Sequence, residues 1–186
     1  MTSVVALFFD LGRSPKRAAL RDAVAAAAAG EGATARAHYA EVFAAKVRLA
    51  VDFAPAEEPA DLEREGRGLD ALAHLGLARL AVESGDLATA KRELAASGKS
   101  LDRGQRSAIE AQESLVAARI ELASGEATAA FRRLKRLVVS RETLDGTEGW
   151  LLLAIAAHET GQKETLEQAL EVARRRSVDL GPLANL

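Results

Sequence analysis

One short pattern occurs three times in the sequence: Gly85-Asp86-Leu87-Ala88-Thr89-Ala90, Gly125-Glu126-Ala127-Thr128-Ala129-Ala130 and Gly161-Gln162-Lys163-Glu164-Thr165-Leu166. In each copy the glycine follows an apolar helical stretch and precedes an amphipathic one. Glycine readily adopts the left-handed backbone conformation that ends many helices. The pattern therefore predicts antiparallel helices joined in pairs, with a glycine at each turn.

The copies recur 40 and 36 residues apart, a period typical of helical repeats. A fainter copy begins at Gly30, 55 residues before Gly85. We attribute the excess length to a longer second helix and to the acidic run Ala54-Pro55-Ala56-Glu57-Glu58-Pro59. Four helical hairpins are therefore expected.

The expected organisation has four parts. Gly66 and Gly68 disfavour helix, so residues 61–68 are expected to form at most a short helical turn. The parts are an N-terminal apolar segment with the first hairpin (1–53), an acidic Pro/Gly linker (54–68), three hairpins (69–176) and a C-terminal tail (177–186).

Small and large residues recur at fixed distances from each turn glycine. Seven residues before it stand Ala23, Ala78, Ala118 and Ala154. Five residues after it stand Ala35, Ala90, Ala130 and, as the exception, Leu166. Nine residues after it stand Tyr39, Leu94, Leu134 and Leu170. Alanines let paired helices approach closely, and the large residue is expected to fill the space between hairpins.

Composition favours helix throughout. Alanine dominates the apolar residues, aromatic residues make up 4% and prolines number 4. Alanine is the strongest helix former, and a hydrophobic content of 48% is enough for a buried core. We expect an all-α fold of antiparallel helical hairpins stacked as a short solenoid.

The residue types that carry chemistry are poorly arranged for it. The absence of cysteine excludes thiolate zinc sites and cysteine nucleophiles. A helical metal site usually has a second His or Cys three or four residues from the first. No such neighbour occurs near His38, His74 or His158. Glu110 and Glu113 lie one turn apart on a polar helical stretch, whereas general acid–base catalysis needs carboxylates held in a desolvated cleft, and no such cleft is indicated. We expect no catalytic residue, no metal site and no cofactor, and hence a protein that is not an enzyme.

The charge argues against a protein that coats nucleic acid or membrane. The net charge is −2 and the pI is about 6.0. Few aromatic residues lie near the basic clusters for stacking on bases. Nucleic-acid binding is therefore disfavoured. The clusters are Arg132, Arg133, Lys135 and Arg136, and Arg174 to Arg176.

An apolar run precedes the first helix, whose start is marked by Ser14-Pro15. The run lacks the features of a signal peptide, and no apolar run approaches the roughly 18 residues that span a bilayer. A cytoplasmic protein is expected. The segment Val4–Leu11 is expected to cover the exposed end of the first hairpin, and docking into a second copy is the alternative. Such a homodimer would use Val4, Val5, Leu7, Phe8 and Phe9.

The alternation resembles the tetratricopeptide repeat, a helical hairpin of about 34 residues, over most of the chain. Trp150 matches the aromatic residue that this family prefers early in the first helix. Other family positions differ, so a related hairpin repeat or a plain bundle is the alternative. The differing residues are His74 and Ser114 at the aromatic position, Ala81, Glu121 and Ala157 where tyrosine is usual, and Asp102 and Val178 in place of the closing proline.

The resemblance implies a peptide groove lined by the first helix of each hairpin. Its candidate residues lie ten, six and three residues before the turn glycines. They are Leu20, Leu75, Arg79, Val82, Leu115, Arg119, Leu122, Leu151, Ile155 and His158. The asparagine and lysine residues with which some members clamp a C-terminal carboxylate are missing. A chiefly aliphatic groove implies an amphipathic helix or an apolar strand as ligand.

The sequence thus favours a non-enzymatic scaffold that binds a peptide or helix of a partner protein. The first alternative is a structural protein that associates with itself through its apolar ends. The second is a helical regulator that contacts nucleic acid through the basic helix at 132–136.

Overall fold

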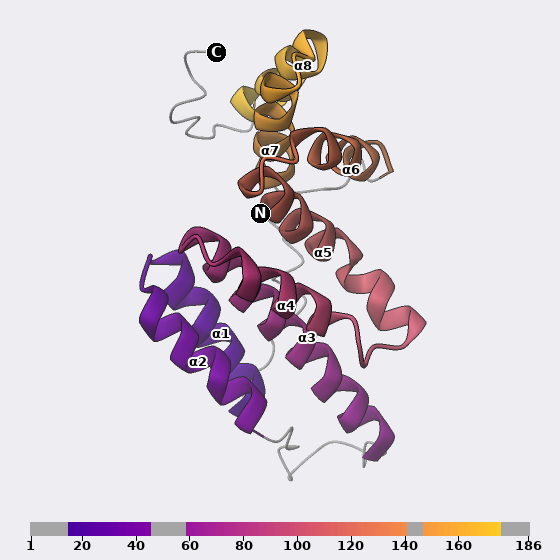
Figure 1. Cartoon of the computed structure of the whole chain (residues 1–186). Helices are drawn as coiled ribbons and strands as arrows, with labels where there is room; N and C mark the ends of the chain where they lie inside the picture. Colours follow the sequence, from indigo (N-terminus) through magenta and orange to yellow (C-terminus); the bar gives the residue numbers. More distant parts are fainter. Residues whose placement is uncertain (1–14, 46–58, 141–146, 176–186) are drawn as a thin grey trace. The chain divides into compact units, whose positions relative to one another are not determined.

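A computed structural model describes residues 15–45, 59–140 and 147–175. Of these residues 87% are helical and none lies in a strand, which confirms the all-α class (Figure 1). Among the described helices, none combines the length and the apolar composition that a membrane span requires. The described helices are α1 (Pro15–Ala28), α2 (Gly32–Ala44), α3 (Pro59–Glu83), α4 (Leu87–Ser97), α5 (Arg103–Ala123), α6 (Ala127–Ser140), α7 (Thr147–Glu159) and α8 (Lys163–Arg175).

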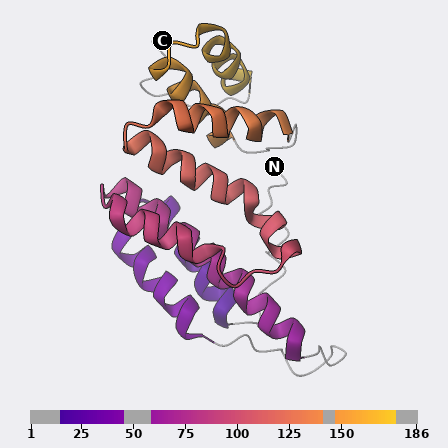
Figure 2. The same cartoon turned by 45° about the vertical axis from the view of Figure 1, so that its right-hand side comes forward.

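The chain divides into two compact units. The N-terminal unit contains α1 to α4 and α5 as far as Glu113. In it α1 packs along α2 and α3 packs along α4, as Figures 1 and 2 show, and α3 also contacts α1 and α2. The C-terminal unit contains the rest of α5 with α6, α7 and α8. In it α7 packs along α8 and against α6.

The four hairpin turns share one backbone conformation. Gly30, Gly85, Gly125 and Gly161 have φ angles of 78°, 78°, 75° and 69°. Each glycine N–H donates to the carbonyl three residues earlier, and the next N–H donates to the carbonyl five residues earlier. This Schellman arrangement satisfies carbonyls that the helix end leaves unpaired. The predicted role of the turn glycines is confirmed.

The repeated small residues lie in the core. The alanines seven residues before each glycine are all 0% exposed: Ala23, Ala78, Ala118 and Ala154. Five residues after it, the three alanines are buried and Leu166 is half-buried. Of the large residues, Tyr39, Leu134 and Leu170 are buried, whereas Leu94 is half-buried. The predicted register is thus correct, with Leu94 as the weakest position.

Tyr39 illustrates how a small residue makes room for a large one. Its ring lies against Gly76 of α3, where any Cβ would overlap the ring. Burial raises the pKa of Tyr39, while Arg79 acts in the opposite direction and Glu83 adds to the increase. Glycine disfavours a helix interior, so the close approach of Tyr39 accounts for its use here.

The prediction for residues 61–68 is wrong. Instead of a linker with a short turn, these residues belong to α3, which begins at Pro59 and runs through Gly66 and Gly68. Proline suits the first helical position, and the negative charge of Asp61 in the first turn interacts favourably with the helix dipole. Contacts with α1 and the start of α5 then offset the glycines. They are the ion pairs Arg17–Glu65, Lys16–Asp70 and Arg64–Asp102, and the hydrogen bond from Gln105 to the Arg64 carbonyl.

Several expectations fall outside the described residues. They concern the apolar segment Val4–Leu11, Ser14 as N-cap, the acidic run as far as Glu58 and the tail 177–186.

Candidate functional site

Two helices of the C-terminal unit carry rows of predicted groove residues. Residues spaced by three and four lie on one face of a helix, so each row forms a single stripe. The row on α5 is Leu115, Arg119 and Leu122, and the row on α7 is Leu151, Ile155 and His158.

An ion pair joins the two rows. Nε of Arg119 donates to Oε1 of Glu148 over 2.6 Å. Glu148 lies one turn before Leu151 on the same stripe of α7. The Arg119 side chain is 21% exposed and that of Glu148 is 31% exposed, so both are partly withdrawn from water. The two rows therefore border one surface, here called the α5/α7 face.

The α5/α7 face is mainly aliphatic and only partly covered. Leu115 and Leu122 are half-buried against the hydrophobic cluster of the C-terminal unit. Leu151 and Ile155 are also half-buried, and His158 is exposed at the end of α7. Each aliphatic side chain thus keeps some area in water that a ligand would cover.

The N-terminal unit offers fewer of the predicted residues. Leu75 is only 4% exposed and Leu20 is buried as well, so a ligand would reach little of either. Arg79 is exposed, with its Nε donating to Glu83 over 3.2 Å. Val82 is half-buried. In this unit α3 presents chiefly Arg79 and Val82.

Sequence reasoning missed two residues. Val24 of α1 is 44% exposed and stands six residues before its turn glycine, at the offset of Arg79, Arg119 and Ile155. Its offset was the signal that could have identified it. Glu148 could have been found from its spacing to Leu151, but its partner Arg119 is 29 residues away in the sequence.

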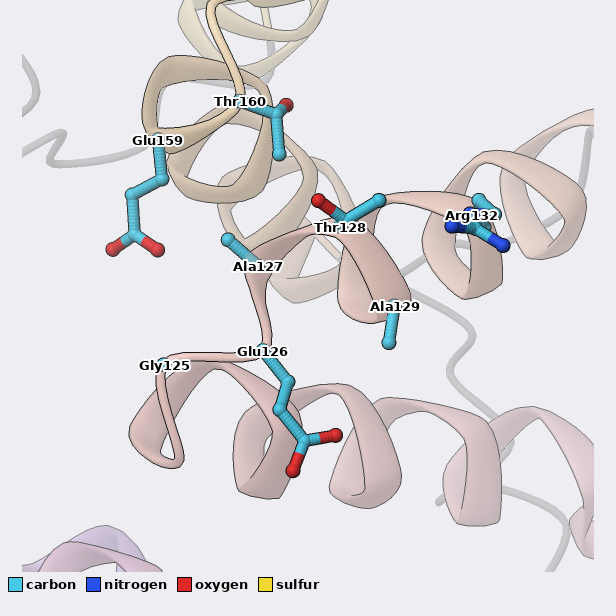
Figure 3. Close-up of a pocket in the computed structure, with 8 residues that line it drawn as sticks. All are labelled: Gly125, Glu126, Ala127, Thr128, Ala129, Arg132, Glu159 and Thr160. Carbon is cyan, nitrogen blue, oxygen red and sulfur yellow. The ribbon is translucent and has the colours of Figure 1, made fainter.

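A shallow pocket of about 530 Å³ lies at the turn from α5 to α6, and Figure 3 shows that residues at the end of α7 complete its lining. Its two carboxylates, those of Glu126 and Glu159, belong to exposed residues. General acid–base chemistry favours carboxylates held in a desolvated cleft, so this pocket is not arranged for it.

Two of the three histidines each lie beside a carboxylate. Nδ1 of His38 lies 3.1 Å from Glu41, and Nδ1 of His74 lies 2.8 Å from Glu93. The Phe43 ring lies 4.6 Å from that of His74, centroid to centroid. Within the described ranges no three His, Asp or Glu side chains are grouped so that they could hold a metal ion.

No family model, curated protein or solved structure matches this chain. The function proposed below therefore depends on the residues and contacts of the α5/α7 face.

Proposed function

We propose that the hairpins are tetratricopeptide-like repeats, and that the chain is a non-enzymatic scaffold which binds a peptide or helix of a partner protein on the α5/α7 face. The observation that carries this proposal is the Arg119–Glu148 ion pair. It brings two rows of half-buried aliphatic residues to one surface. A cytoplasmic location belongs to the same proposal.

The repeat geometry supports the assignment of this face. In all four hairpins the alanine seven residues before the glycine is fully buried. The next residue along, six before the glycine, is never buried: Val24, Arg79, Arg119 and Ile155. The residues seven before the glycine thus face the core in every hairpin, and the residues six before it are at least partly exposed in every hairpin.

The chemistry of the face favours an amphipathic ligand. Covering the remaining apolar area of Leu115, Leu122, Leu151 and Ile155 would contribute roughly 25 cal/mol per Å² buried. Arg119 and Glu148 already form an ion pair with each other. A ligand helix that covers them therefore leaves no unpaired buried charge, even if it carries no charged group at that point. A partner helix with aliphatic residues at i, i+3 and i+4 matches this surface.

Site-specific crosslinking tests the proposal. A photo-crosslinking residue at Leu151 or Ile155 should capture the partner in cells, whereas the same residue at Glu167 on the exposed side of α8 should not. With the purified partner, Ile155→Glu should weaken binding at least roughly tenfold, as for a central apolar contact. Glu167→Lys is the control and should leave affinity unchanged.

Capture from position 167 instead of 151 or 155, or unaltered affinity of Ile155→Glu, would refute the assignment of this face.

Light scattering and salt titration separate the alternatives. Self-association would raise the apparent mass with concentration, and nucleic-acid binding would weaken steeply with salt.

A further inference from the structure

α6 has an unbalanced charge. It is the only helix in the described part of the chain that combines several cations with no carboxylate of its own. Its cations are Arg132, Arg133, Lys135 and Arg136. The chain as a whole has a net charge of −2, so this concentration of positive charge is local.

One of these cations has a structural partner. Nε and Nη2 of Arg133 both donate to Glu121 of α5, with distances of 3.1 and 2.6 Å to Oε1. This hydrogen bonding raises the pKa of Arg133, although burial opposes it. Arg133 therefore fastens α6 to α5.

The other three cations are exposed and lie on one side of the helix. Arg132, Lys135 and Arg136 follow at i, i+3 and i+4, and no carboxylate in the described ranges forms an ion pair with them. Nε of Arg136 donates to the carbonyl of Arg132 over 3.4 Å. Nζ of Lys135 lies 5.6 Å from the centroid of the Phe131 ring. We call these three residues the basic face of α6.

The fold gains nothing evident from the basic face. The opposite side of α6 supplies its packing, with Ala130 and Leu134 fully buried. Like charges three or four residues apart on a helix are destabilising, and a bound anion relieves that repulsion. The cluster of three cations thus destabilises α6 when nothing is bound, and a bound anionic partner removes that cost.

We propose that the basic face of α6 binds an acidic segment of a partner protein. On a helix, the Cβ atoms of residues one turn apart lie about 5–6 Å from each other, so the three cations have the same spacing along α6 as carboxylate residues one turn apart on a partner helix. A guanidinium can bind each carboxylate through two hydrogen bonds. The basic face shares no residue with the α5/α7 face, and it would add an electrostatic contact to the mainly aliphatic one proposed there.

The observations favour a protein segment over nucleic acid. The three cations occupy little more than one helical turn, whereas nucleic-acid binding depends on contacts to several phosphates. Bases would also need exposed aromatic rings for stacking, but Phe131 is half-buried and faces Lys135.

Fluorescence anisotropy with the full chain tests the proposal. The probes are a labelled poly-glutamate peptide, a mixed-sequence DNA duplex and phosphatidylglycerol vesicles, all at the same low salt. The peptide should bind best. Combining Arg132→Glu, Lys135→Glu and Arg136→Glu should weaken peptide binding at least roughly tenfold, as expected for a charge-dominated contact. The same three sites changed to Gln should weaken it in the same direction.

The matched control changes three exposed cations of α8 in the same unit, Lys163→Glu, Arg174→Glu and Arg175→Glu, and should leave peptide binding within about twofold of the original. Circular dichroism checks that each variant keeps its helices. If the Glu variant does not fold, the result with the Gln variant tests the proposal. Absence of peptide binding, an equal loss in the α8 control, or tighter binding of the duplex or vesicles would each overturn the proposal.

Discussion

Glycine has opposite roles at the hairpin turns and in the first half of α3. At Gly30, Gly85, Gly125 and Gly161 the positive φ angle ends one helix and positions the next. Gly66 and Gly68, by contrast, remain within an unbroken helix. The same residue type therefore terminates a helix only where the following backbone also closes the turn.

The difference lies in the origin of the stabilising contacts. At a hairpin turn the hydrogen bonds run between residues at most five apart in the sequence. In the first half of α3 the stabilising contacts come from residues far away in the sequence, as in the ion pairs Arg17–Glu65 and Arg64–Asp102. Asp102 also forms a capping box with Gln105, in which each residue's side chain accepts from the other's backbone N–H. Local geometry thus governs the turns, and tertiary contacts govern the start of α3.

The first prediction tests whether the turn at Gly125 sets the register of the core. Leu134, nine residues after that glycine, is fully buried. Leu134→Ala should lower the free energy of unfolding by roughly 2–5 kcal/mol in a urea titration, because it leaves a cavity. Arg132→Ala, on the solvent side of the same helix, should change it by no more than about 0.5 kcal/mol. Similar losses in both variants would show that the register is wrong.

The second prediction concerns glycine directly. Gly125→Ala should destabilise the protein by about 1–2 kcal/mol, because an L-residue at φ 75° is strained although its Cβ meets no atom within 4 Å. Gly68→Ala should be neutral or stabilising, because alanine in a helix interior is more favourable than glycine by about 1 kcal/mol. Its Cβ would meet Nε2 of Gln105 at 3.3 Å, so the end of that side chain, which donates to the Arg64 carbonyl, has to shift by a few tenths of an ångström. Thermal unfolding measures both, and effects of the same sign and size would remove the contrast.

A smaller effect is expected from the polar contacts of α3. Arg17→Ala or Glu65→Ala should cost no more than about 1 kcal/mol, since both side chains are partly exposed. Amide hydrogen exchange should nevertheless accelerate in residues 60–68 more than at the hairpin turns. Arg92→Ala on α4 is the control. Unchanged exchange at 60–68 would mean that these ion pairs do not maintain the helix there.

The smallest effect concerns pH. The backbone N–H of Gln105, together with Arg64, holds the pKa of Asp102 below its usual value of 3.8. A carboxylate with a lowered pKa in the folded state stabilises the fold above its usual pKa, and that contribution is lost as the pH falls below it. Unfolding in urea from pH 5 down to pH 2 should therefore show a slightly smaller loss of stability in Asp102→Asn than in the original chain. Equal losses would mean that the ionisation of Asp102 does not contribute to the pH dependence, since asparagine also caps a helix.

The candidate site was predictable only in part. The offsets from the turn glycines placed Leu115, Leu122, Leu151 and Ile155 on helix stripes that the structure leaves partly exposed. The same rule included Leu75, which is buried. An offset specifies the direction of a side chain on its own helix, but burial depends on what packs beside that helix.

The four turns, the buried alanine rows and the all-α class were predictable from the residues alone. These features follow from glycine's backbone freedom and from helical periodicity, which act over a few residues. The helical state of residues 61–68 and the ion pair between Arg119 and Glu148 are visible only in the folded chain. Both depend on contacts between residues about 30 to 50 positions apart, such as Arg119–Glu148 and Arg17–Glu65, and no local pattern encodes the energies of such contacts.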